Sequence, residues 1–92
     1  METQEIYCRI TGRVQLVMFR DFAARRARRL GLVGYVKNLQ DGSVEAVAQG
    51  APERLDQFAG ALRRGSLLSR VDRVDVEHRA PTARYGDFTI AW

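Results

Sequence analysis

Residues 12–20 read GRVQLVMFR and end on an arginine directly before a helical pattern. A loop between a strand and a helix aims its backbone N–H groups at one point, where the helix N-terminus adds partial positive charge. The guanidinium of Arg20 supplies a planar fork of donors that matches phosphate oxygens. The stretch predicts a phosphate cradle, but without the glycines and Lys-Ser/Thr ending of a nucleotide-binding loop. The alternative is an apolar connection that packs into the core, with Arg20 as a surface residue, and spacing alone favours this alternative over the cradle.

Asn38 is the second candidate, near the end of a strand-like segment. Its amide offers an acceptor and a two-proton donor, which together can orient a water molecule. The alternative is that Asn38 begins the turn through Gln40, Asp41 and Gly42, a common role for asparagine. Taken alone, Asn38 fits the turn better.

The elements that would position these residues follow from periodicity. Residues 5–11 and 70–78 alternate apolar and polar side chains, as half-buried strands do. Residues 21–30 and 52–64 carry apolar side chains at helical spacing and end at Gly31 and Gly65. Residues 32–39 and 43–50 form a hairpin across an Asp-Gly turn, and residues 87–92 predict a short last strand.

The element order predicts the fold class. A β-α-β-β-α-β order plus a short fifth strand indicates an α+β, ferredoxin-like βαββαβ sandwich, with an antiparallel sheet and two helices on one face. The length of 92 residues fits one domain, residues 1–92. This fold hosts many functions and does not select one.

Composition narrows the function classes. The net charge is +4, but the acidic residues are interspersed with the basic ones, which favours solvated faces over nucleic-acid binding. An RNA-binding version of the fold would stack bases on strand aromatics, and residues 43–49 have none. No apolar run could span a membrane, no signal peptide is visible, and the single cysteine excludes an internal disulfide. We expect a cytoplasmic monomer.

Two motifs in the correct order resemble those of the acylphosphatase family. GRVQLVMFR is similar to the family signature G-x-V-Q-G-V-x-[FY]-R. GYVKNLQDGSVEAVAQG resembles the second signature, which runs from a glycine-aromatic pair through an asparagine into a hairpin. The resemblance covers nearly the whole chain.

The resemblance implies hydrolysis of acyl phosphates to a carboxylate and inorganic phosphate, without a metal or cofactor. It implies that Arg20 binds the phosphoryl group and that Asn38 positions the attacking water. Acyl phosphates have a good leaving group, so positioning and charge neutralisation suffice for catalysis. The backbone N–H groups of the loop would hold the phosphate oxygens, and the loop residues before Arg20 are Gln15, Leu16, Val17, Met18 and Phe19.

Leu16 stands where the family signature has glycine. If this position adopts a positive φ, leucine costs on the order of 1–2 kcal/mol. If the glycine allows close approach of phosphate, the leucine side chain would block it. We therefore expect reduced or altered acylphosphatase activity, and a non-catalytic phosphate-binding module is the alternative.

Four other residues are interpreted structurally. His78 is the sole histidine and shares a strand face with valines, which favours a structural role over a catalytic base. Cys8 lies on the apolar face of the first strand and is expected to be inert core. Trp92 is expected in the core of the last strand, and Met18 is expected to be partly buried.

Overall fold

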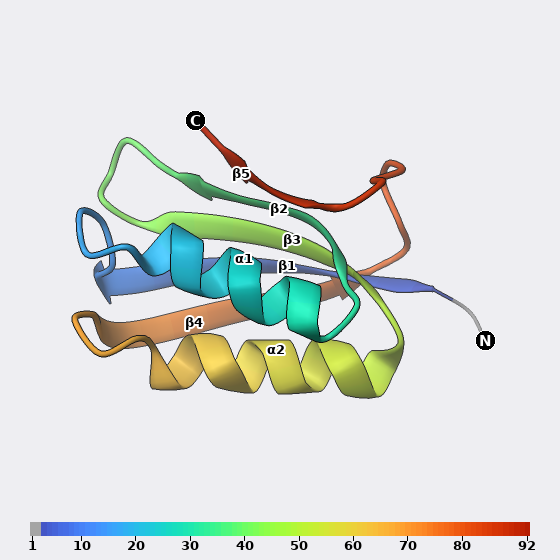
Figure 1. The fold of residues 1–92 in the computed structure, drawn as a ribbon, viewed down its shortest axis with the longest axis horizontal. Helices are drawn as coiled ribbons and strands as arrows, with labels where there is room; N and C mark the ends of the chain where they lie inside the picture. Colours follow the sequence, from blue (N-terminus) through green and yellow to red (C-terminus); the bar gives the residue numbers. More distant parts are fainter. Residues whose placement is uncertain (1–2) are drawn as a thin grey trace.

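The computed structural model describes residues 3–92, which form a five-stranded sheet and two helices. Both helices lie on one face of the sheet (Figure 1). In chain order the elements are β1 (Gln4–Arg13), α1 (Phe19–Arg29), β2 (Val33–Asn38), β3 (Val44–Gly50), α2 (Pro52–Arg64), β4 (Arg70–Arg79) and β5 (Phe88–Ala91).

The strand order across the sheet is β4-β1-β3-β2-β5. Neighbouring strands are antiparallel except β2 and β5, which run parallel. The predicted α+β sandwich is confirmed, and the parallel fifth strand is a feature that local periodicity does not reveal.

The core lies between the sheet and the helices. Ile6, Cys8 and Ile10 of β1 are buried, as their alternation predicts. Pro52 is at the first position of α2, where its missing N–H leaves no broken bond, and Gly65 ends the helix with φ 73°. The helices complete the core with two apolar stripes, Phe19, Ala23 and Ala27 from α1 and Leu55, Phe58 and Leu62 from α2.

One end of the sheet gathers four segments that are distant in sequence. Because β1, β2 and β5 run in one direction and β4 runs against them, three strands end where β4 begins. The four segments are the β1–α1 loop (14–18), the β2–β3 turn (39–43), the α2–β4 turn (65–69) and the last residues (91–92). The loop and the two turns lie together at the left of Figure 1.

Trp92 corrects one expectation from the sequence. Its side chain is 91% exposed, so it is not part of the core. The pairing of β5 with β2 stops at Ala91 opposite Lys37, and Trp92 therefore extends past the sheet.

Candidate active site

The β1–α1 loop has an unusual backbone. Leu16 and Met18 both have φ 62°, in the left-handed region that glycine normally occupies. Met18 caps α1, and its carbonyl accepts a bond from the N–H of Phe22 at 3.1 Å. A left-handed residue followed by a helical one turns successive N–H groups towards one point, which forms an anion-binding concavity.

This geometry shifts the predicted boundary between loop and helix. The sequence placed Arg20 at the end of the loop, whereas the helix begins at Phe19 and includes Arg20 in its first turn. The bond from the N–H of Phe22 to the carbonyl of Met18 closes that turn, and the helix begins two residues before the predicted start at residue 21. Arg20 therefore projects from the positive end of α1.

Side chains of the loop alternate between core and solvent. Val17 and Phe19 are buried and fix the loop on the core. Leu16 is 100% exposed and Met18 is 70% exposed, so the expectation that Met18 is partly buried is wrong. The left-handed backbone at these two positions turns their side chains outward. Leu16 consequently packs on nothing, and its cost is conformational.

Gln15 ties the loop to the β2–β3 turn. Its amide nitrogen Nε2 donates to the carbonyl oxygens of Leu39 and Ser43, both at 2.8 Å. The turn itself is closed by Asp41, whose Oδ1 accepts from the N–H and the hydroxyl of Ser43. These hydrogen bonds from Ser43 lower the pKa of Asp41. The loop is thus linked directly to the segment that follows Asn38.

Arg20 is held in place without an ion pair to a carboxylate of the described residues. Its Nη1 donates to the carbonyl oxygen of Ala91 at 3.1 Å, and its Cζ lies 4.4 Å from the centre of the Trp92 ring. No carboxylate within residues 3–92 forms an ion pair with it. A positive group fixed by a neutral carbonyl and a ring remains available to an anion.

Asn38 is the last residue of β2, at the same end of the sheet. Its Oδ1 is buried and has no hydrogen-bond partner among the described residues. An unpaired buried acceptor costs about 1–3 kcal/mol, and native structures usually satisfy such groups with water or ligand. Its side-chain oxygen does not bond to the 39–43 turn, as a turn-initiating asparagine would.

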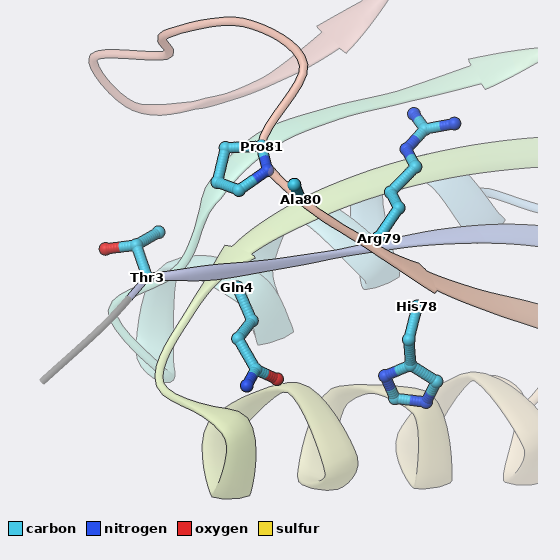
Figure 2. Close-up of a pocket in the computed structure, with 6 residues that line it drawn as sticks. All are labelled: Thr3, Gln4, His78, Arg79, Ala80 and Pro81. Atoms are coloured by element: carbon cyan, nitrogen blue, oxygen red, sulfur yellow. The ribbon is translucent and has the colours of Figure 1, made fainter.

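His78 lies far from this site. It lines a hollow of about 370 Å³ at the opposite end of β1. Figure 2 shows His78 pointing towards α2, while Arg79 points the other way. No hydrogen-bond partner within residues 3–92 orients its ring, so the arrangement of an acid–base pair is missing there. Cys8 is buried, and burial raises the pKa of its thiol to about 12, as expected for inert core.

No helix within residues 3–92 is long and apolar enough to cross a bilayer. Nor do three or more His, Cys, Asp or Glu side chains gather there in a way that could hold a metal ion.

The fold and the loop define an α+β sandwich with a left-handed strand-to-helix connection between β1 and α1. The sequence model of the acylphosphatase family matches residues 6–90. The chain belongs to the acylphosphatase family.

This chain is similar to individual acylphosphatases over nearly their whole lengths. An acylphosphatase of Methylococcus capsulatus is 42% identical, with 95% of both chains covered. One of Thermococcus kodakarensis is 45% identical over 94% of both chains. The crystal structure of acylphosphatase from Bacillus subtilis superimposes with a TM-score of 0.93 at 34% identity, covering 97% of this chain and 99% of that one.

Sequence reasoning missed two features of this end. The stacking of Trp92 on Arg20 depends on the place of β5 beside β2, which no local pattern reveals. Leu67 and Leu68, which lie in the α2–β4 turn, are both exposed. A pair of leucines between polar residues in RGSLLSR was a readable signal for an exposed apolar surface.

Proposed function

We propose that this chain hydrolyses the carboxyl–phosphate bond of acyl phosphates, releasing a carboxylate and inorganic phosphate. The proposal rests on three features at one end of the sheet: the left-handed loop, Arg20 without an ion pair in the described chain, and Asn38 with a buried, unpartnered oxygen. Membership of the acylphosphatase family supports this activity.

The loop and Arg20 would hold the phosphoryl group. Backbone N–H groups of residues 15–20 would donate to its oxygens, and the Arg20 guanidinium would neutralise their charge. Phosphoryl transfer passes through a loose transition state with negative charge on the equatorial oxygens, so fixed donors stabilise it directly. Because Ala91 and Trp92 hold the Arg20 side chain in place, the guanidinium needs little reorganisation when the phosphoryl group binds.

Asn38 would position the attacking water. Its unpartnered Oδ1 accepts a hydrogen bond from a water molecule, whose oxygen then faces phosphorus. A bond forms between the water oxygen and phosphorus, and the bond from phosphorus to the acyl oxygen breaks. The acyl oxygen leaves as carboxylate, and the proton of the water passes to a phosphate oxygen of the substrate.

The effect of Leu16 on activity stays a prediction. The φ of 62° meets the condition under which leucine costs on the order of 1–2 kcal/mol. The full exposure of its side chain favours this conformational cost over steric blockage of the cradle. The single-domain organisation of residues 1–92, the monomeric state and the cytoplasmic location likewise stay predictions.

The proposal is tested by hydrolysis of benzoyl phosphate by the whole chain, with inorganic phosphate as competitor. We expect turnover inhibited by phosphate, and loss of both turnover and phosphate binding in Arg20→Ala. The Arg20→Lys variant is the matched control: it keeps the charge and loses the planar fork, so it should recover only part of the binding. Phosphate binding without any turnover in the wild-type chain would instead identify a non-catalytic anion-binding module.

A further inference from the structure

An apolar groove of about 370 Å³ opens beside the β1–α1 loop. Met18 and Phe22 form one wall, and Leu67 and Leu68 of the α2–β4 turn form the other. The volume lies within the range of small-molecule sites. Met18 belongs to both the β1–α1 loop and the groove, because its backbone lies in the left-handed loop while its side chain lines the groove.

Among the described residues, the large hydrophobic side chains that are exposed lie at this end of the molecule. Leu67 is 97% exposed and Leu68 is 66% exposed. Together with Leu16, Met18 and Trp92 they make up the exposed large hydrophobic residues of the described chain, and all lie in segments that meet at one end of the sheet. An apolar cluster of this kind beside a site indicates binding of an apolar group.

The strand order places the groove opposite Asn38. Across the sheet end, the turn before β4 lies on one side of the loop that follows β1, and Asn38 at the end of β2 lies on the other. Figure 1 shows the β1–α1 loop between the β2–β3 turn and the α2–β4 turn. In-line displacement at phosphorus requires the water and the leaving group on opposite sides. A water held by Asn38 therefore directs the leaving acyl oxygen towards the groove.

The charge inside the groove favours an uncharged acyl chain. Arg25 lines the groove, but its Nε lies 3.0 Å from the Asp21 carboxylate, so its charge is already paired. An acyl chain carrying a second carboxylate would have to compete with Asp21. An apolar chain would cover leucine and methionine surface that is otherwise in water.

We propose that this groove binds the acyl group of the substrate and makes the enzyme selective for acyl phosphates with apolar aliphatic or aromatic chains. The inference rests on the proposed acyl phosphate hydrolysis. Leu67 and Leu68 are then specificity residues outside the phosphate cradle.

The test compares kcat/KM for acetyl, butyryl and hexanoyl phosphate, which share the phosphoryl group and differ only in chain length. In the wild-type chain kcat/KM rises with length, by at least about tenfold from acetyl to hexanoyl. The double variant L67S/L68S removes most of this rise, leaving acetyl phosphate hydrolysis and inhibition by phosphate unchanged. The control Ala80→Ser, at an exposed residue at the opposite end of the molecule, keeps the wild-type rise.

The outcomes separate this inference from the proposed function. Hydrolysis with equal kcat/KM for all three chains, or a rise that survives L67S/L68S, overturns the acyl groove while the acylphosphatase activity stands. Absence of hydrolysis of every acyl phosphate overturns both. A dimer that dissociates in L67S/L68S without any change in chain-length preference would instead assign the groove to an interface between two copies.

Discussion

Arg20 and Trp92 are stacked, with the guanidinium Cζ 4.4 Å from the centre of the indole ring. The two residues lie in the first turn of α1 and directly after β5, and the parallel pairing of β5 with β2 brings them together. A ring orients the guanidinium without neutralising it, whereas a carboxylate would compete with phosphate. We therefore propose that Trp92 positions the guanidinium of Arg20, the group proposed to bind phosphate.

Replacing Trp92 with alanine should loosen Arg20 and weaken phosphate binding. Loss of a cation–π contact predicts an increase in the inhibition constant for inorganic phosphate of between about twofold and thirtyfold. Because Trp92 is exposed, the free energy of unfolding should change little. Trp92→Phe keeps a ring and should recover most of the binding. Equal inhibition constants in all three proteins would exclude the positioning role.

Replacing Asn38 with alanine should separate activity from stability. We expect hydrolysis to fall on the order of a hundredfold, because the attacking water loses its positioning partner. The free energy of unfolding should stay within about 1 kcal/mol, since the variant removes a buried oxygen that has no partner in the described chain. Urea unfolding and benzoyl phosphate turnover measure the two effects.

The neighbouring variant Lys37→Ala is the control for Asn38. Successive strand residues point to opposite faces of the sheet, so Lys37 leaves the water site untouched. Its turnover should match that of the wild-type chain. A loss of stability above about 3 kcal/mol in Asn38→Ala, with turnover preserved, would assign Asn38 a structural role.

Replacing Leu16 with glycine should stabilise the loop. Glycine relieves the strain of the left-handed backbone, but its larger backbone entropy in the unfolded chain offsets part of that gain. The net prediction is an increase of roughly 0.5–1 kcal/mol in the free energy of unfolding. Turnover should rise with it if the leucine impairs the loop. Leu16→Ala shortens the side chain but retains Cβ, so it separates strain from steric blockage. Turnover unchanged by Leu16→Gly would refute the predicted impairment.

Acid should destabilise the fold through Glu5. This carboxylate is fully buried. Burial raises its pKa, but its hydrogen bonds outweigh that effect and hold the pKa below the ordinary value of 4.5. Glu5 therefore contributes stability above that pH, and the contribution is lost as the pH falls through the lowered pKa. The donors to Glu5 are the side chains of Gln49 and Arg79 and both the N–H and hydroxyl of Thr82.

The variant Glu5→Gln tests this contribution. It should lower the free energy of unfolding at pH 7 by about 1–3 kcal/mol and flatten the dependence on pH below 4.5. Glu77→Gln is the control, because Glu77 is exposed and lies 3.6 Å from Arg79. Identical pH dependence of unfolding in wild type and Glu5→Gln would contradict the assignment.

Local patterns in the sequence predicted most of the fold, because the spacing of apolar residues in each segment agrees with the helix or strand that the segment forms. The alternation around Ile6 and the position of Pro52 mark a strand and a helix start with a direct physical cause. The position of Arg20 directly before a helical pattern is the reason for predicting it as a phosphate-binding residue, and that role stays a prediction. The resemblance to a family signature pointed to a positive φ at residue 16, which the structure shows at Leu16.

The remaining features depend on contacts between segments distant in sequence. Trp92 continues an alternating pattern, yet it lies outside the core because the pairing of β5 with β2 stops at Ala91 opposite Lys37. The outward side chain of Met18 depends on a left-handed backbone that its residue type disfavours. The groove requires the α2–β4 turn beside the β1–α1 loop, and that neighbourhood follows from the strand order.

The most direct test of the proposed mechanism is the fate of the water oxygen. Benzoyl phosphate is hydrolysed by the wild-type chain in water enriched in the heavy oxygen isotope, and both products are analysed by mass spectrometry. Attack on phosphorus by a water held at Asn38 predicts one heavy oxygen in the phosphate and none in the benzoate. Heavy oxygen in the benzoate would show attack at the carbonyl carbon and would contradict the roles proposed for Arg20 and Asn38.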